Sequence, residues 1–359
     1  MTHAGVMSQT ILVTGGLGFI GSHFVRIVLR ERPGTRVINL DKMTYAGNPD
    51  NLADVEHNPN YTHVLGDIRN QEVVQRVLSE EKPFAIVNFA AESHVDRSIM
   101  SSSPFLQTNI LGVQTLLDVM RQFPVERFVQ ISTDEVYGDI AADAPPATEE
   151  AALRPSNPYS ASKAAAEMLC LAYERTYQIP VVVVRSSNNY GPYQHPEKLF
   201  PLMIRNALGG EILPIYGDGK QVRDWLYVED NAKAVLCVLE QGQVGLIYNA
   251  GAGEARENLE VVSRICEYLA QERGSNIENY RNLIRFVEDR PGHDRRYATD
   301  TRRIREELGW LPETPFDQGF RQTVQWYLAH PDWIERVISG EYHRYYSEVY
   351  DRSWGRKPV

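Results

Sequence analysis

Cysteine is scarce in this chain, which has three among 359 residues, Cys170, Cys237 and Cys266. They lie far apart in apolar stretches of helical character, and none has the spacing of a metal-ligand set. We therefore expect reduced thiols in the core of a cytosolic protein, with no disulfide framework and no metal site.

Long hydrophobic runs and an excess of positive charge are also missing. No stretch of about eighteen apolar residues occurs, and no basic segment followed by an apolar core opens the chain. We expect no membrane contact and no export, and we expect residues 1–9 to form a loose leader. The 37 Lys and Arg residues against 47 Asp and Glu give a net charge of -10. This charge argues against a nucleic-acid partner, because phosphate backbones bind basic surfaces.

What the chain does contain, through its first half, is an alternation of short β-rich runs with helical patterns. This alternation is typical of a parallel sheet covered by helices on both faces. Strands are predicted at 11–14, 36–41, 61–65, 84–90, 127–132 and 180–185. Helices are predicted at 19–30, 72–80, 108–121 and 159–177. The predicted fold class is α/β, a doubly wound parallel sheet, in which ligands bind at the carboxyl ends of the strands.

A glycine-rich turn, with Gly15, Gly18 and Gly21, joins the first predicted strand to the first predicted helix. This is the context of a dinucleotide fingerprint, in which glycine lets the backbone approach a pyrophosphate at the helix N-terminus. Asp41 follows about twenty residues later, where a carboxylate accepts hydrogen bonds from the adenosine ribose and repels a 2′-phosphate. The pattern predicts NAD rather than NADP, although the neighbouring Lys42 slightly weakens that preference.

The pattern becomes less regular after about residue 187. We predict a dinucleotide-binding domain over 10–187, followed by a smaller α/β substrate lobe over 188–224 and 251–345. A helix over 225–239 and a strand over 245–250 are expected to return to the sheet of the first domain.

Tyr159 and Lys163 lie four residues apart on a predicted helix and therefore share one face. An ammonium about 4 Å from the phenol is worth about 4 kcal/mol at an effective dielectric of about 20. That energy lowers a phenol pKa from ~10 to about 7. The pair therefore predicts a base that removes a proton from an alcohol.

Thr133, Asp134 and Glu135 directly follow the fifth predicted strand. Two adjacent carboxylic acids at a strand end are suited to paired proton transfers in a cleft. The alternative is that the two acids cap the next helix or solvate a loop, which is the commoner role of an isolated Asp-Glu pair.

Several segments resemble a known family. The glycine turn together with Tyr159-x-x-x-Lys163 resembles the extended short-chain dehydrogenases/reductases, and 131–138, ISTDEVYG, resembles the signature of their nucleotide-sugar 4,6-dehydratases. Further matching segments are 90–98, 187–194, 196–199, 223–230 and 289–297. The resemblance covers about 11–327.

The resemblance implies a Rossmann domain that binds NAD and a lobe that binds a nucleotide sugar. Besides the three glycines, Asp41, Tyr159 and Lys163, the implied cofactor residues are Phe19, Ile20, Lys42, Thr44, Asp67, Ile68, Ala90, Ala91, Ser93, Thr108 and Asn189. The implied substrate residues are His94, Thr133, Asn188, Lys198, Leu199, Pro214, Tyr216, Arg223, Asn258, Arg290 and His293. For His94, a purely structural hydrogen-bonding role is an equally good interpretation.

The implied reaction is the dehydration of dTDP-glucose to a 4-keto-6-deoxy sugar. Tyr159 would take the 4-hydroxyl proton, with Thr133 and Lys163 holding the oxygen and the phenolate. Glu135 would then remove the C5 proton while Asp134 protonates the departing 6-hydroxyl, and hydride would return to C6. Asp134 must then stay protonated near neutral pH, which burial and the charge of Glu135 favour.

Other interpretations remain open. The same reaction could act on a UDP-sugar, and a 4-epimerase would keep the Tyr-Lys pair without needing the two carboxylates. A non-catalytic NAD-binding regulator is a remote alternative. Apolar positions on the helices predicted at 108–121 and 159–177 cover more than one stripe, which favours a homodimer like those implied by the resemblance.

Overall fold

The structure is a computed structural model in which residues 9–338 are described. Residues 1–8 of the predicted leader and 339–345 of the predicted lobe lie outside the described residues. Within 9–338, no helix has the length and apolar character needed to cross a membrane. The cytosolic location and the proposed division into domains stay predictions.

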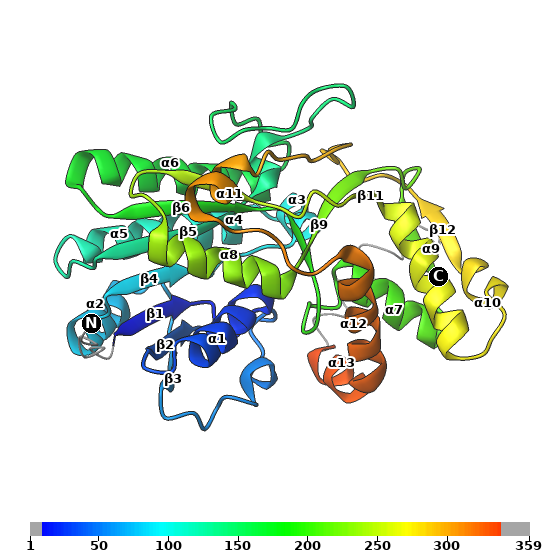
Figure 1. The fold of residues 1–359 in the computed structure, drawn as a ribbon, viewed down its shortest axis with the longest axis horizontal. Helices are drawn as coiled ribbons and strands as arrows, with labels where there is room; N and C mark the ends of the chain where they lie inside the picture. The colour runs from blue at the N-terminus through cyan, green and yellow to red at the C-terminus, as the bar shows by residue number, and fades with distance from the viewer. Residues whose placement is uncertain (1–8, 339–359) are drawn as a thin grey trace.

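A seven-stranded parallel sheet lies at the centre of the molecule (Figure 1). Its order is β10-β6-β5-β4-β1-β2-β3, and all neighbouring strands are parallel. The strands are β1 Thr10–Thr14, β2 Arg36–Asp41, β3 Tyr61–Leu65, β4 Ala85–Asn88, β5 Arg127–Thr133, β6 Val181–Ser186 and β10 Ile247–Ala250. Because the chain proceeds outward on both sides of the β1/β4 pair, the carboxyl ends of these strands form the switch point where doubly wound sheets bind ligands. The predicted fold class is confirmed.

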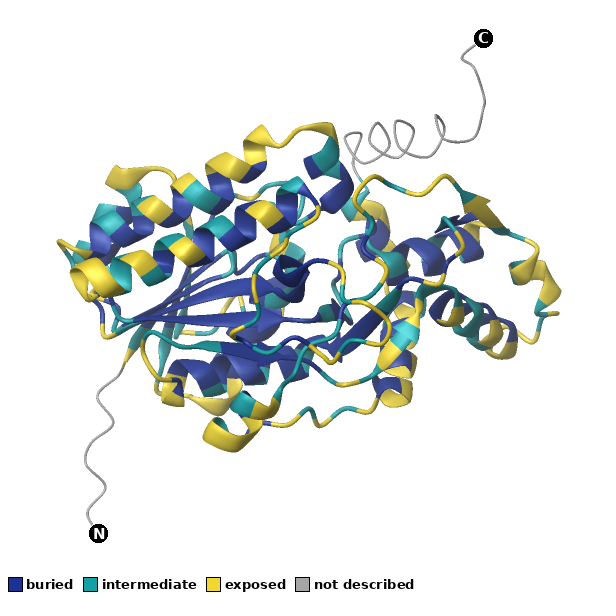
Figure 2. Cartoon of the chain, turned by 90° about the horizontal axis from the view of Figure 1, so that it is seen from above, coloured by how far each residue is buried: buried dark blue, intermediate teal, exposed yellow. Residues whose placement is uncertain are grey.

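Helices cover both faces of the sheet (Figures 1 and 2). On one face, α1 Phe19–Glu31 packs against α8 Val228–Gln241. The other face carries α2 Gln71–Glu81, α5 Val113–Met120 and α6 Pro158–Tyr177. This double cover explains why the strands read as nearly continuous hydrophobic runs rather than as an alternation.

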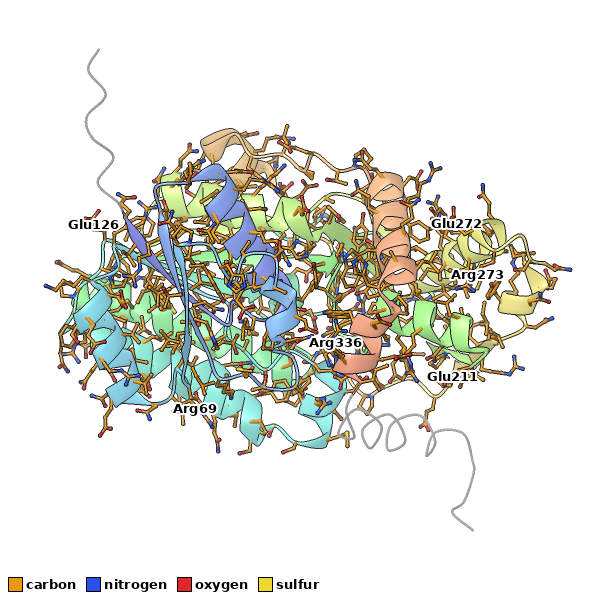
Figure 3. All side chains as sticks on the ribbon, turned by 90° about the horizontal axis from the view of Figure 1, so that it is seen from below. Arg69, Glu126, Glu211, Glu272, Arg273 and Arg336 are labelled. Carbon is orange, nitrogen blue, oxygen red and sulfur yellow. The ribbon has the colours of Figure 1, made fainter. Side chains whose placement is uncertain are left out.

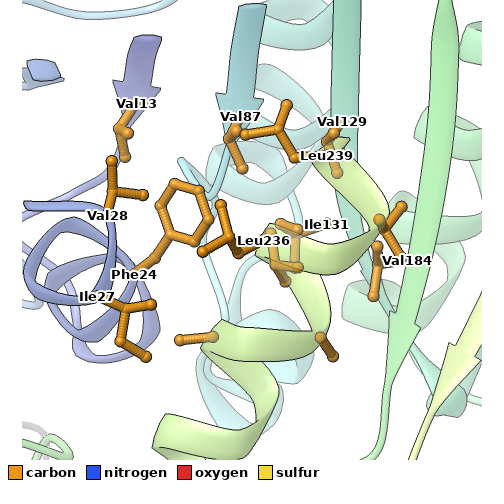
Figure 4. Close-up of a cluster of buried hydrophobic side chains, with 14 of the residues drawn as sticks. Val13, Phe24, Ile27, Val28, Val87, Val129, Ile131, Val184, Leu236 and Leu239 are labelled. Carbon is orange, nitrogen blue, oxygen red and sulfur yellow. The ribbon is translucent and has the colours of Figure 1, made fainter. Parts of the chain in front are cut away.

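The core is divided by the sheet into two apolar clusters. Along β1, Val13 belongs to the cluster under α1 and α8, whereas Leu12 belongs to the cluster on the opposite face. Figure 4 shows Phe24 of α1 and Leu236 of α8 packed against Val13 and the neighbouring strand valines. Charged side chains such as Glu126 and Arg273 project outward instead (Figure 3).

A second lobe has its own core, rich in aromatic residues, on the right of Figure 1. Its strands are β7 Asn188–Tyr190, β9 Val222–Tyr227 and β11 Ala255–Glu257 in one small sheet, with β8 Leu213–Tyr216 and β12 Ile284–Val287 in another. Its helices are α7 Leu199–Gly209, α9 Asn258–Glu272, α10 Glu278–Arg281, α12 Phe316–Ala329 and α13 Pro331–Val337. The remaining short elements are η1 Pro49–Leu52, α3 Val95–Met100, α4 Ser103–Phe105, η2 Leu106–Gly112, η3 Asp134–Tyr137 and α11 Arg302–Leu308.

Three predicted elements differ from the structure. The helix predicted at 225–239 is wrong at its start, because 225–227 ends strand β9, whose Trp225 and Tyr227 are buried in the core of the lobe. Strand β4 ends at Asn88 rather than at 90, which leaves a loop at the switch point. The helix predicted at 108–121 begins earlier, because α4 continues through the π-helical η2 into α5.

Candidate active site

The glycine turn after β1 packs too tightly for any side chain. A Cβ on Gly15 would lie 2.6 Å from the Ala90 nitrogen, and one on Gly21 would lie 2.4 Å from the Gly15 oxygen. Gly15 also has φ +70°, which favours glycine. Gly18 begins α1 without a side-chain cap, so the N-terminal amides of this helix are available to an anion. These features fit a dinucleotide pyrophosphate.

A large cavity opens at the carboxyl ends of the strands. Every residue predicted to bind NAD lines this cofactor cavity. These residues are Gly15, Gly18, Phe19, Ile20, Gly21, Asp41, Lys42, Thr44, Asp67, Ile68, Ala90, Ala91, Ser93, Thr108, Tyr159, Lys163 and Asn189. The structure therefore brings together segments that lie far apart in the sequence.

Asp41 is held at the end of β2 by two backbone amides. Its carboxylate accepts hydrogen bonds from the nitrogens of Leu17, at 3.0 Å, and Met43, at 2.8 Å. Burial raises the pKa of Asp41. Lys42 lies 3.7 Å from a carboxylate oxygen of Asp67. Asp67 is also paired with Arg69, at 2.7 Å.

Tyr159 and Lys163 both face the cofactor cavity from α6. The Lys163 ammonium donates to the Ile131 carbonyl at 2.6 Å. Burial, followed by the charge of Glu135, raises the pKa of Tyr159 well above its ordinary value. A hydrogen bond with Thr133 lowers this pKa but does not offset the effect of burial. Burial also lowers the pKa of Lys163 to about 8. The expectation that Lys163 brings the Tyr159 pKa to about 7 is therefore wrong for this structure, since burial of the phenol dominates.

Asp134 and Glu135 form the first turn of η3, directly after β5. The group that caps this turn is Thr133, whose hydroxyl accepts the Glu135 amide at 3.3 Å, so neither carboxylate serves as the cap. Burial, followed by the charges of Glu135 and Asp224, raises the pKa of Asp134 well above its ordinary value. The expected direction of the Asp134 pKa shift and its expected causes are confirmed.

The two carboxylic acids differ in their access to ligands. Glu135 lines the cofactor cavity and a second cavity in the lobe, whereas Asp134 is 2% exposed and lines neither. The nearest charges to Asp134 include Arg223, which lines the second cavity. One oxygen of each acid, Asp134 Oδ2 and Glu135 Oε2, is buried without a hydrogen-bond partner among the described residues. Such atoms are the ones that a ligand could satisfy.

The second cavity is lined by the predicted substrate residues, except that Thr133 lines the cofactor cavity. These residues are His94, Asn188, Lys198, Leu199, Pro214, Tyr216, Arg223, Asn258, Arg290 and His293. We call it the substrate cavity. The residues shared by the two cavities are Glu135, Asn188, Asn189, Gln194 and Lys198. The two cavities therefore meet at Glu135.

Three cations, Lys198, Arg223 and Arg290, line the substrate cavity and give it the positive charge that suits a diphosphate. Lys198 donates to the Ser93 carbonyl at 2.8 Å and Arg223 to that of Asp294 at 2.9 Å. Burial lowers the pKa of both Lys198 and Arg223, which is the sign of charges poorly compensated by the protein itself. Arg290 has one buried nitrogen, Nε, without a partner among residues 9–338.

Both histidines of the substrate cavity are neutral near pH 7, because burial lowers the pKa of His94 and of His293 to about 4. His94 Nε2 lies 3.3 Å from the Glu197 carbonyl oxygen, and His293 Nδ1 lies 2.6 Å from Asp289 Oδ1. His94 therefore makes a hydrogen bond within the protein, as its structural interpretation requires, and it also lines the substrate cavity. Tyr216 packs edge-on against His293.

Two features of the site were not predicted. Trp333 and Val337 of α13 line the cofactor cavity, and the Trp333 indole donates to Asn51 Oδ1 at 3.0 Å across 282 residues of sequence. Asp96 accepts from Arg290 at 3.1 Å, which orients that cation. No local pattern marks Trp333, but Asp96 lies within the segment 90–98 that carried the resemblance.

Known proteins resemble this chain along nearly all of its length. It matches the family model described as GDP-mannose 4,6 dehydratase over residues 12–323. The dTDP-glucose 4,6-dehydratase of Neisseria meningitidis serogroup B is 51% identical over 346 residues, covering 93% of this chain and 97% of that protein. The enzyme of that name from Escherichia coli is 46% identical over 352 residues, covering 92% and 97%.

The chain belongs to the nucleotide-sugar 4,6-dehydratase family. A solved dTDP-glucose 4,6-dehydratase of this family, from Streptomyces venezuelae with NAD bound, has a TM-score of 0.86 at 45% identity and covers 92% of this chain and 100% of that one. The UDP-glucose 4-epimerase of Thermotoga maritima has a TM-score of 0.80 at 29% identity, covering 90% and 100%. Dehydratases and epimerases share this fold. The two activities must therefore be distinguished by their catalytic side chains.

Proposed function

We propose that this chain dehydrates dTDP-glucose to dTDP-4-keto-6-deoxyglucose with bound NAD. The observation that carries the proposal is that Glu135 lies where the two cavities meet, directly after Thr133 on the cofactor cavity and the buried Asp134, within a chain about half identical to proteins of that activity. Bound NAD supplies the hydride acceptor for C4, the hydride donor for C6 and a positively charged nicotinamide ring.

Oxidation at C4 requires a base and a group that holds the oxygen. We assign Tyr159 as the base for the 4-hydroxyl proton, with the Thr133 hydroxyl as the second contact to the same oxygen. Lys163 faces the same cavity and stabilises the phenolate with its charge. Because burial raises the Tyr159 pKa, the phenolate forms only when positive charge is near it.

Elimination of water requires one base and one acid in different protonation states. Glu135 removes the proton from C5, which the 4-ketone has made acidic, and Asp134 donates its proton to the 6-hydroxyl as the C6–O bond breaks. The raised Asp134 pKa supplies the protonated acid. The two neighbouring carboxyls thus take the roles of acid and base.

Substrate positioning follows from the charges of the lobe. We assign Lys198, Arg223 and Arg290 to the diphosphate, for which arginine offers a two-pronged donor. Tyr216 and Asn258 lie at the same cavity and are assigned to the nucleoside. A UDP-sugar differs from the proposed substrate only at the nucleoside, so it is the second candidate.

The test is incubation of the purified protein with dTDP-glucose in deuterated water, followed by mass spectrometry and NMR of the sugar. The expected product has lost one water and carries a 4-ketone, a 6-methyl group and deuterium at C5. A parallel reaction with UDP-glucose compares the two nucleotides. Formation of a galactose derivative without loss of water would contradict the dehydratase and remove the roles of Asp134 and Glu135.

We also propose that the enzyme is a homodimer built on the η2 and α6 helices. Leu106 and Leu111 on η2 are 46% and 52% exposed, and Met168 on α6 is 47% exposed. The η2 and α6 segments pack against each other, so these apolar side chains belong to neighbouring helices. Exposed apolar side chains grouped in this way support an interface.

A further inference from the structure

A buried carboxylate lies behind the catalytic segment without touching either cavity. Glu167 follows Lys163 by one turn of α6 and is fully buried. One of its oxygens accepts a hydrogen bond from the Ser132 hydroxyl. The other accepts two from Arg185, at 3.0 Å from Nε and 2.7 Å from Nη2. All of the carboxylate's bonds are therefore made within the core.

Arg185 extends this connection to the far side of the same segment. Its Nη1 donates to the Tyr137 hydroxyl at 2.7 Å, and that hydroxyl donates to Asn249 Oδ1 at 2.7 Å. Ser132 directly precedes Thr133, and Tyr137 ends η3. The Glu167–Arg185 pair thus holds both ends of the short segment that carries Thr133, Asp134 and Glu135.

Glu167 also acts on Lys163 through its charge. The Lys163 ammonium donates to the Ile131 carbonyl on β5, and Glu167 and Cys170 on α6 are the titratable groups that raise its pKa. Burial lowers the pKa of Lys163 to about 8, and Glu167 is the largest influence that raises it. A buried ion pair such as Glu167–Arg185 is often no more stable than an apolar pair of the same volume, so fold stability alone does not account for it.

We propose that Glu167 is a positioning residue for the dehydratase reaction, which keeps Lys163 in its ammonium form and holds Thr133, Asp134 and Glu135 between Ser132 and Tyr137. This inference rests on the proposed function. The Glu167 side chain touches neither cavity, so its effect reaches the substrate only through Lys163 and through the segment after β5.

The decisive variant is Glu167→Gln, which keeps the shape of the side chain and removes its charge. Without that charge, the ammonium of Lys163 loses its proton at lower pH. The alkaline limb of the rate of C4 oxidation is expected to move toward neutral pH by about one pH unit or more. The readout is the single-turnover absorbance of enzyme-bound NADH after mixing with dTDP-glucose across the pH range.

The single variant leaves Arg185 buried without its carboxylate, which can prevent folding. The double variant Glu167→Gln/Arg185→Gln replaces the ion pair by two neutral hydrogen-bonding groups and is expected to show the same displaced limb. Glu149→Gln is the matched control, because Glu149 is also buried. Its Oε1 accepts a hydrogen bond from the Asn249 backbone amide, and its side chain contacts neither Ser132 nor Lys163. Its alkaline limb should coincide with that of the unaltered protein.

A rate that falls equally at all pH values in the Glu167 variants would make Glu167 merely structural and overturn the inference. An unchanged profile, or an equal displacement in Glu149→Gln, would overturn it as well. The unaltered protein separates this test from that of the proposed function. If the unaltered protein forms no 4-keto sugar, the proposed function is wrong. If it forms that sugar but the alkaline limb of the Glu167 variants is not displaced, only the role of Glu167 is contradicted.

Discussion

Asp134, to which we assign the role of general acid, has a raised pKa and an oxygen without a fixed partner. Burial is the main cause that raises the pKa of this carboxyl, and its Oδ2 has no hydrogen bond among the described residues. Glu135 and Arg223, whose charges both act on Asp134, line the substrate cavity, so in the proposed mechanism the 6-hydroxyl reaches Asp134 directly or through one water. We therefore expect Asp134 to act in the elimination rather than in the oxidation.

Asp134→Asn should separate these two steps. The amide has the same shape but cannot donate the proton, so elimination is expected to slow by about 10²- to 10⁴-fold. C4 oxidation depends on Tyr159 and should change little, so NADH accumulates on the enzyme and is visible by absorbance. Asp143→Asn, at an exposed position, is the control. Equal losses in both steps would contradict the role of acid.

For individual residues, the sequence predicted which side chains gather and the direction of the Asp134 pKa shift, but not the direction of the Tyr159 pKa shift. Asp134 and Glu135 were recognisable because the two acids are adjacent at a strand end, in a segment that resembles a family signature. The raised pKa of Tyr159 was not predictable, since it follows from burial by residues distant in sequence. Nor could the i, i+4 spacing show that the Lys163 ammonium donates to a strand carbonyl.

Among the elements, α13 contributes most to the site beyond what was predicted. Trp333 donates to Asn51, and the Asn51 amide donates to the Leu17 carbonyl of the glycine turn at 2.8 Å. Arg336, which is labelled in Figure 3, forms a second connection, to Asp50 at 2.5 Å. Through Asn51, this short helix of the lobe is therefore hydrogen-bonded to the glycine turn that we expect to hold the pyrophosphate.

Trp333→Phe should weaken NAD binding. The substitution removes the indole N–H but keeps an aromatic ring, and the lost Trp333–Asn51 hydrogen bond of about 1–1.5 kcal/mol raises the Kd for NAD by at most about five- to twelvefold. Calorimetric titration of the NAD-free protein measures this directly. Trp326→Phe is the control, because Trp326 packs against the same ring without lining the cavity. Equal affinities in the two variants would show that α13 has no part in retaining NAD.

The elements of the sheet were predictable because each strand is a β-rich run between helical patterns. The failure at 225–227 arose because Trp225 and Tyr227 carry no mark that distinguishes a strand in the lobe from the first turn of α8. Both side chains are buried against other aromatic residues of the lobe, and this burial favours the strand over the helix. The π-helical η2 was also beyond prediction, since its sequence continues smoothly into α5.

For the whole molecule, the exposed apolar side chains of η2 and α6 predict the oligomeric state. The double substitution Leu111→Glu/Met168→Glu places two charges in the proposed interface and should convert the dimer to a monomer at micromolar concentration. Sedimentation velocity measures the change. Leu311→Glu is the matched control, since Leu311 is 58% exposed outside these helices. An unaltered protein that sediments as a monomer would rule out the dimer.

The meeting of the two cavities at Glu135, Asn188, Asn189, Gln194 and Lys198 has a consequence for substrate choice. The nucleoside end is assigned to Tyr216 and Asn258 in the lobe, and the reacting carbons must lie at the shared wall. The diphosphate then acts as a ruler between these fixed points. If these assignments hold, a sugar joined to its nucleoside through one phosphate would hold C4 short of Tyr159, and we expect the length of the substrate to affect its selection.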